Sequence, residues 1–136
     1  MSMLRWGLNL LIGGWGLYNL MPVLSTAAYK TGNLKPVPAD VQRYTPLMEA
    51  TQWWHLGVWA VLVLLLLAAS WRIFSGAKAA LLMAIATVLD VGLWWLFSQM
   101  PAYKQVFTAA ELQADYYIMG GLAVATLVTW LTERGK

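Results

Sequence analysis

The sequence predicts an all-α integral membrane protein, with residues 1–136 forming a single domain built as a four-helix transmembrane bundle. The first observation is composition: 60% of the residues are hydrophobic and 11% are charged, against roughly a quarter charged in ordinary soluble domains. The second is that four apolar segments approach the ~17–25 residues that a spanning helix needs. The third is that Trp and Tyr gather near the segment ends, as they do at membrane interfaces. The expected spans are about 4–21, 53–70, 79–98 and 116–131.

The first segment resembles a signal peptide, because Arg5 precedes the apolar run and "STAA" follows it. The chain begins at Met1 and retains this segment, so we expect an uncleaved first span. A long outer loop of about 22–45 should follow, because "TGNLKPVPAD" contains Gly32 and two prolines that disfavour a regular helix.

Two later segments carry signals for the start of a helix. In "TPLMEATQ", Thr45 is a candidate N-cap and Pro46 suits the first helical position, so the second helix should begin outside the membrane. "TAAE" at Thr108–Glu111 has the form of a capping box, in which the hydroxyl and the carboxylate each accept a backbone N–H. The fourth helix should therefore begin near Ala109 and project beyond the lipid headgroups.

The basic residues predict the orientation. Cytoplasmic loops carry an excess of Lys and Arg, and the short turn that contains Arg72 and Lys78 is where this rule applies best. We therefore expect a multi-pass protein of the bacterial inner membrane with both termini in the cytoplasm. The side with five basic residues carries Arg5, Arg72, Lys78, Arg134 and Lys136, and the side with four carries Lys30, Lys35, Arg43 and Lys104.

The positions of the aromatic residues also support a topology with four membrane spans. The chain is rich in tryptophan, with nine in all, and indole rings favour the boundary between lipid and water. Trp15 and Trp59 lie deeper than either interface. The expected outer interface contains His55 together with Trp53, Trp54, Trp94 and Trp95.

Small residues predict which helix faces pack closely. Glycines in "IGGWGLYN" would let a neighbouring helix approach the first span. The fourth span shows a similar stripe with Gly121 and Ala125. The second span is bulky on every face, which predicts a peripheral, largely lipid-facing position. The glycines of the first span are Gly13, Gly14 and Gly16.

Asp90 lies in the middle of an apolar run, "AIATVLDVGLWW". A charge at the centre of a bilayer costs about 2.5–3.5 kcal/mol on insertion scales, so an intramembrane acid is a candidate functional site. One hypothesis is a neutral or hydrogen-bonded carboxyl that holds helices together, and the other is a proton- or cation-coupling site. The candidate donors to its carboxyl are Thr87, Thr126, Trp15 and Trp59.

The single histidine, His55, is expected to be an interfacial, hydrogen-bonded residue, with Glu49, Glu111 or Asp115 as possible acidic neighbours. A transmembrane bis-histidine haem needs two histidines, and the chain has no cysteine for a thiolate site. We predict no metal and no cofactor. Single axial ligation of a pigment or haem by His55 stays open as an alternative.

The sequence argues against two classes of function, enzymatic catalysis and nucleic-acid binding. The predicted spans contain no paired carboxylates, no nucleophile–base pair and no metal-ligand cluster, so we expect no enzymatic activity. No run of basic residues indicates nucleic-acid binding. We expect a non-catalytic accessory or assembly subunit of a larger bacterial inner-membrane complex, with energy-converting complexes as one candidate class. Its partners would be the lipid bilayer and other membrane subunits, bound through the transmembrane helices and the outer loop. The alternative is a small homo-oligomeric transporter that couples protons or ions through Asp90.

Overall fold

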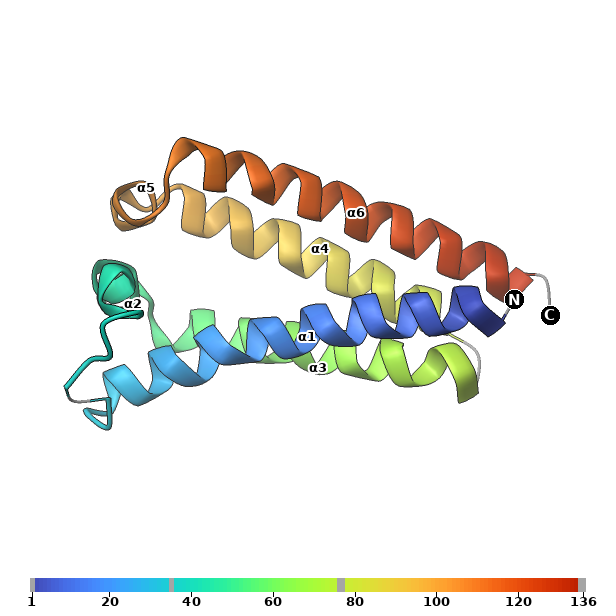
Figure 1. Cartoon of the computed structure of the whole chain (residues 1–136), viewed down its shortest axis with the longest axis horizontal. Coiled ribbons are helices and arrows are strands. Elements are labelled where there is room, and N and C mark those ends of the chain that lie inside the picture. Colours follow the sequence, from blue (N-terminus) through green and yellow to red (C-terminus); the bar gives the residue numbers. More distant parts are fainter. Residues whose placement is uncertain (1, 35, 76–77, 135–136) are drawn as a thin grey trace.

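The computed structural model describes residues 2–34, 36–75 and 78–134, and every regular element in these ranges is helical. Lys35 and Lys136, which count in the predicted charge distribution, lie outside the described residues. Four helices are long: α1 (Ser2–Lys30), α3 (Trp53–Ser75), α4 (Ala79–Ser98) and α6 (Ala109–Arg134). Two short helices and a 3₁₀ turn lie together at one end of the molecule (Figure 1): η1 (Gln42–Tyr44), α2 (Thr45–Ala50) and α5 (Pro101–Val106).

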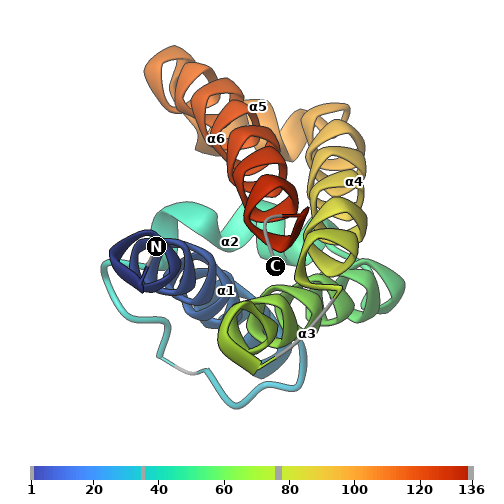
Figure 2. The same ribbon diagram turned by 90° about the vertical axis from the view of Figure 1, so that its right-hand side faces the viewer.

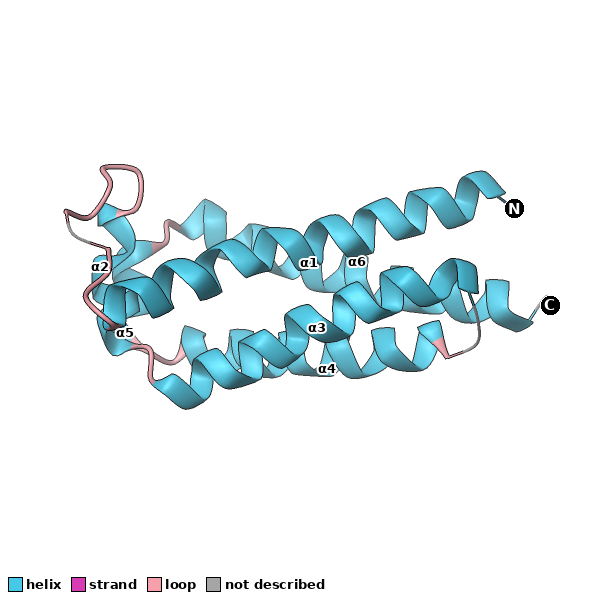
Figure 3. Ribbon diagram, turned by 90° about the horizontal axis from the view of Figure 1, so that it is seen from below, coloured by secondary structure: helices cyan, strands magenta, loops and turns pink. Residues whose placement is uncertain are grey.

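Three of the long helices are long and apolar enough to cross a membrane, so the chain is an all-helical membrane protein. They are α3 over Trp53–Phe74, α4 over Ala79–Ser98 and α6 over Ala109–Arg134, with mean hydropathies of 2.1, 2.0 and 1.2. Within the described residues, α1 is not among them. The long helices run without interruption, and most of the loop residues gather beside α2 and α5 (Figure 3).

The long helices pack in the order α1, α3, α4, α6. Seen from the end they form an open arc, because α1 and α6 do not close against each other (Figure 2). Helix α1 begins at the end of the bundle where α6 ends (Figure 1). The core between the helices is apolar and contains the fully buried side chains of Ile12, Leu62, Leu66 and Met83.

The expectation that the second span lies at the periphery is wrong. Helix α3 packs against α1 on one side and α4 on the other, and it buries a larger share of its residues than α4 or α6. The bulky side chains of α3 pack against the glycines of α1, since a Cβ built on Gly16 would lie only 3.2 Å from Leu66 Cβ. Bulky side chains on α3 therefore fill the space that the small residues of α1 leave open.

The outer loop is shorter than expected, because α1 continues through Pro22 to Lys30. A proline removes one backbone N–H, which membrane helices tolerate where neighbouring groups compensate, and the residues beyond it, Val23 and Thr26, are buried. The helix ends where Gly32 adopts a left-handed φ of 79°. Gly32 N–H donates to Tyr29 O (3.1 Å) and Asn33 N–H donates to Ala28 O (2.8 Å), the pattern of a Schellman motif.

The segment before α3 also differs from the prediction. Thr45 is not an N-cap of the second span; it begins the separate short helix α2, and its backbone N–H donates to Gln42 O at the end of η1. That helix ends at Ala50, and its C-cap Thr51 has an extended backbone, with φ −72° and ψ 125°. Thr51 N–H and Thr51 Oγ1 both donate to Leu47 O, at 2.9 and 2.7 Å, and these hydrogen bonds cap the end of α2. The next helix, α3, begins at Trp53.

The capping box before α6 is confirmed. Glu111 N–H donates to Thr108 Oγ1 and Thr108 N–H donates to Glu111 Oε1, each at 3.2 Å, and α6 begins at Ala109. Arg43 strengthens this corner, because its guanidinium donates to both Glu111 oxygens (2.7 and 2.9 Å) and to Val106 O (3.1 Å). The start of α6 is thereby tied to the first loop.

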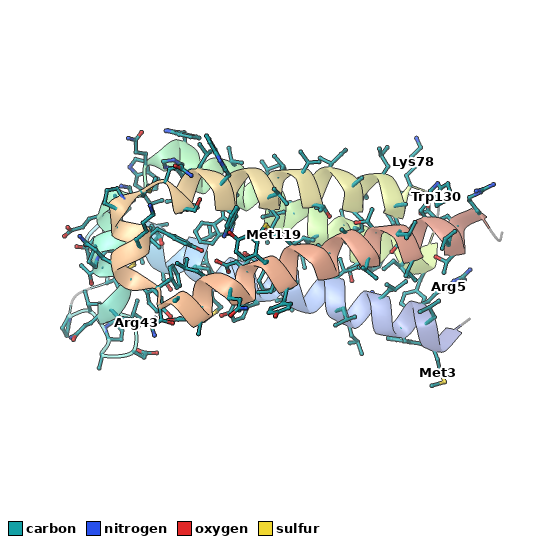
Figure 4. The ribbon with its side chains drawn as sticks, turned by 90° about the horizontal axis from the view of Figure 1, so that it is seen from above. Met3, Arg5, Arg43, Lys78, Met119 and Trp130 are labelled. Carbon is teal, nitrogen blue, oxygen red and sulfur yellow. The ribbon has the colours of Figure 1, made fainter. Side chains whose placement is uncertain are left out.

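The opposite end of the bundle is basic. Figure 4 shows Arg5, Lys78 and Trp130 at this end and Arg43 at the other. Glu133, an acidic residue of this end, accepts a hydrogen bond from Ala80 N–H (3.1 Å) at the start of α4. We call this the basic end; its described basic residues are Arg5, Arg72, Lys78 and Arg134.

Candidate functional site

Asp90 lies on α4, partly buried, and no described residue forms a hydrogen bond or an ion pair with its carboxyl. It lies three residues beyond Thr87 and four before Trp94, which places the three side chains on one face of α4. The contacts of Thr87 and Trp94 show that this face is turned toward α6. Asp90 therefore lies on the face of α4 that packs against α6, and its carboxyl forms no hydrogen bond with a described residue.

The two threonines predicted as donors to Asp90 bind each other. Their hydroxyl oxygens, Thr87 Oγ1 and Thr126 Oγ1, lie 3.2 Å apart. Thr126 donates its own hydroxyl hydrogen to Leu122 O (2.8 Å), so Thr87 is the donor in the pair. This bond joins α4 to α6.

The two tryptophans predicted as donors also point elsewhere. Trp59 Nε1 donates to Asn19 Oδ1 (3.0 Å), and Asn19 Nδ2 donates to Trp15 O (2.8 Å), which ties α3 to α1. Trp15 stacks on Tyr18 with 5.4 Å between ring centroids, and its buried Nε1 has no hydrogen-bond partner among the described residues. Neither indole donates to Asp90.

The polar neighbour of Asp90 is Asp115 on α6, which lies close enough for the two carboxyls to interact electrostatically. Asp115 Oδ2 accepts hydrogen bonds from Trp94 Nε1 (3.2 Å) and Tyr103 Oη (2.5 Å). Burial and the hydrogen bond to Asp115 raise the pKa of Tyr103 well above its ordinary value. Tyr103 therefore stays protonated and serves as a hydrogen-bond donor from α5.

The sequence placed Trp94 among the interfacial aromatic residues and did not connect Trp94 or Tyr103 to Asp115. The signal that was missed is the "MPAY" segment, where Pro101 begins the short helix α5. That helix folds back at the end of α4 and carries Tyr103 inward, where its side chain is buried.

His55 is buried, with 4% of its surface exposed, and serves as a cap for α3. Its Nδ1 accepts the backbone N–H of Gln52 (3.0 Å), three residues earlier, as the acidic side chain does in a capping box. The ring packs on Trp54 and Phe97, with centroid distances of 3.8 and 5.3 Å. Its three predicted acidic neighbours bind other residues: Glu49 accepts from Tyr29, Glu111 from Arg43, and Asp115 from Tyr103 and Trp94.

This geometry gives the ring nitrogens different roles. Because Nδ1 accepts a hydrogen bond, the neutral ring carries its proton on Nε2, which then has no lone pair to offer a metal. Axial ligation of a pigment or haem would require that tautomer to change and the cap on α3 to be lost. Among the described residues, no three His, Asp or Glu side chains gather as a group that could hold a metal ion.

The predicted packing residues divide between two surroundings. Gly13 and Gly16 face α3, and a Cβ on Gly13 would lie 2.9 Å from Ser70 Oγ. Gly14 and Gly121 have no atom within 4 Å of such a Cβ, and they line an open groove between α1 and α6 together with Ala125. Of the predicted interfacial residues, Trp53, Trp54 and Trp95 are more than half exposed. Trp94 is partly buried, and its indole N–H donates a hydrogen bond to Asp115.

The chain was compared with known proteins at the levels of family, sequence and structure. No protein family, curated protein or solved structure matches it.

Proposed function

We propose that α1 is a fourth span and that both ends of the chain lie in the cytoplasm of a bacterium, with the protein in its inner membrane. At about 1.5 Å per residue, the 29 residues of α1 extend about 43 Å, more than the ~30 Å of a hydrocarbon core. Asn9 and Asn19, its two amides, both bond to α3 or to α1 itself. The basic end supports the orientation, because cytoplasmic turns favour Lys and Arg.

The function that the geometry supports best is that of a non-catalytic accessory or assembly subunit of a larger inner-membrane complex. The observation that carries this proposal is the exposure of α6, which buries the smallest share of the three candidate spans and packs extensively only against α4. Helices associate in membranes through faces of small residues. The face of α6 turned away from α4 exposes Gly120, Ala123, Val124 and Leu127 at helical spacing.

The polar groups within the helices fit this role, because they are used to join helices of the chain to each other. Asn9 bonds to Ser70 and Trp59 bonds to Asn19 across the contact between α1 and α3. Thr87 and Thr126 join α4 to α6. Such bonds are each worth about 0.6 kcal/mol in membranes. They give a rigid scaffold that presents α6 to a neighbour. Energy-converting complexes, with their many small membrane subunits, are one class of partner.

Purification in mild detergent followed by native mass spectrometry tests the proposal. The chain should be recovered with larger membrane polypeptides in a fixed ratio. Gly120→Leu adds bulk to the exposed face of α6, where no other helix of the described chain lies within 4 Å of an added Cβ, and should release the chain from these partners. Gly57→Leu is the matched control, because it adds the same bulk to an open position on α3. Recovery as a homo-oligomer without another polypeptide would contradict the proposal.

A second candidate is a homo-oligomeric proton- or ion-coupled transporter that uses Asp90. The electrostatic interaction between the carboxyls of Asp90 on α4 and Asp115 on α6 favours it, because intramembrane carboxyls mark proton and ion pathways in pumps and transporters. Reconstitution in vesicles with an imposed proton gradient separates the two functions. A flux that Asp90→Asn abolishes while the protein stays folded would support the transporter.

A further inference from the structure

A polar pocket of about 430 Å³ lies at the end of the bundle opposite the basic end, where α1 ends and α3 begins. Figure 1 shows α2 at this end, beyond the loop that leaves α1. The pocket differs from the groove between α1 and α6 because charged side chains of both signs line it. Its lining residues are Tyr29 and Lys30 of α1, Gly32 of the loop, Glu49 of α2 and Trp53 of α3.

The two charged side chains of the pocket are held by separate contacts. Lys30 Nζ donates to Thr51 O (2.6 Å) and lies 5.6 Å from the centroid of the Trp53 ring. Glu49 Oε1 accepts a hydrogen bond from Tyr29 Oη (2.6 Å). Lys30 and Glu49 form no ion pair with each other. The pocket therefore keeps a positive and a negative charge apart, and neither neutralises the other.

Both charged groups keep hydrogen-bonding capacity for a ligand. A Lys ammonium has three N–H donors, and Thr51 O is the only acceptor of Lys30 among the described residues. A carboxylate accepts at both of its oxygens, and Tyr29 is the only described residue that donates to Glu49. A simple anion in the pocket would be repelled by Glu49, and a simple cation by Lys30. The arrangement therefore favours a ligand that carries one charge of each sign.

The pocket lies at the depth of the lipid headgroups. Trp53 is the first residue of the α3 segment that is apolar enough to cross a membrane, and its ring is more than half exposed. Indole rings favour the boundary between lipid and water. Val61 and Leu64 follow on the same side of α3 and are also exposed. Leu64 lies about 16 Å along the helix axis from Trp53, close to the ~15 Å that one leaflet contributes. A lipid with its headgroup in the pocket therefore has an apolar helix face for its acyl chains.

We propose that this pocket binds the headgroup of phosphatidylethanolamine, with the phosphate at Lys30 and the ammonium at Glu49. A primary ammonium has N–H bonds that a carboxylate accepts, whereas the trimethylated ammonium of phosphatidylcholine has none. Phosphatidylglycerol carries the phosphate without a cation, so Glu49 would repel it. The inference requires that α3 cross the membrane, and it does not depend on the accessory-subunit function.

The test uses the full chain in nanodiscs that contain equal parts of phosphatidylethanolamine, phosphatidylcholine and phosphatidylglycerol. After gentle release into the gas phase, native mass spectrometry should show phosphatidylethanolamine retained in preference to the other two. Glu49→Gln removes the charge but keeps an oxygen that can accept from Tyr29. It should lower the retention of phosphatidylethanolamine about fivefold, the equivalent of about 1 kcal/mol for one exposed ion pair. Asp40→Asn is the matched control, because it removes the same charge at an exposed position outside the pocket.

A second pair of variants tests the phosphate contact. Lys30→Gln should lower the retention of phosphatidylethanolamine by a similar factor, whereas Lys104→Gln, on α5 and outside the pocket, should leave it unchanged. A melting temperature measured for each variant separates loss of lipid from loss of fold. Soluble phosphoethanolamine at the concentration of the lipid should not displace it, because it has no acyl chains to lie along α3. Equal retention of the three lipids would overturn the proposal. So would equal effects of Glu49→Gln and Asp40→Asn, or displacement by soluble phosphoethanolamine.

Discussion

Asn9 and Ser70 hold each other across the contact between α1 and α3. Asn9 Nδ2 donates to both Ser70 O and Ser70 Oγ at 2.9 Å, and Ser70 Oγ donates back to Asn9 O at 3.0 Å. The hydroxyl also fills the space above Gly13, whose missing side chain allows the close approach. Polar bonds and small residues are the usual means by which helices associate in lipid.

Ser70→Ala removes two of these three hydrogen bonds and should lower the free energy of unfolding by about 0.6–1.7 kcal/mol, the range measured for such bonds in membranes. Unfolding in mixed micelles of increasing SDS content measures this change. Ser98→Ala is the control, because the Ser98 hydroxyl bonds only to Trp95 O of its own helix. Equal effects of the two substitutions would show that the Asn9–Ser70 contact does not join the helices.

Tyr103→Phe should make the stability of the protein less sensitive to high pH. The pKa of Tyr103 is raised in the folded chain by burial and by Asp115, so the unfolded chain loses this proton first, near pH 10. The stabilisation is complete below that pH and declines above it, by at most about 1.4 kcal/mol per pH unit. Unfolding midpoints at pH 8 and pH 11 should converge in Tyr103→Phe. Tyr117→Phe, an exposed control, should behave like the unaltered chain.

Asp90→Leu should leave the fold intact. The Asp90 carboxyl makes no hydrogen bond with a described residue, so its removal leaves no donor unpaired. It also removes a group whose transfer into lipid costs about 2.5–3.5 kcal/mol when charged. Thermal unfolding in detergent should show an unchanged or higher midpoint for Asp90→Leu and for Asp90→Asn. A midpoint lowered by Asp90→Leu but not by Asp90→Asn would mean that the carboxyl has a hydrogen-bonding role in packing.

Features set by neighbouring residues in the sequence were the ones that could be predicted. The capping box of Thr108 and Glu111 depends on residues three apart, and it forms as expected. The apolar segments of α3, α4 and α6 follow from composition over about twenty residues. Both signals depend only on residues that are close together in the sequence, so they can be predicted without knowing how the helices pack.

Features set by tertiary contact could not be predicted in the same way. Hydropathy does not say which helix packs against which, so the bulky side chains of α3 predicted a surface facing lipid. In the structure, Gly16 of α1 leaves room for Leu66 of α3, and the two helices pack closely. The position of a candidate donor along its helix can be estimated from the sequence, but this position leaves open the direction in which its side chain points around the helix axis. Thr87 and Thr126, both expected as donors to Asp90, bond to each other instead. Asp115 was missed because α5 brings Tyr103 back over α6.

The proposed four-span topology requires α1 to cross the membrane beside α3. The chain has no cysteine, so single cysteines can report the side on which a residue lies. Met3→Cys, Ala39→Cys and Lys78→Cys, all at exposed positions, should be treated with a membrane-impermeant maleimide in sealed vesicles of known orientation. Residues 3 and 78 should react from the cytoplasmic side, and residue 39 from the opposite side. If residues 3 and 39 reacted from the same side, α1 would not span the membrane and the account would be wrong.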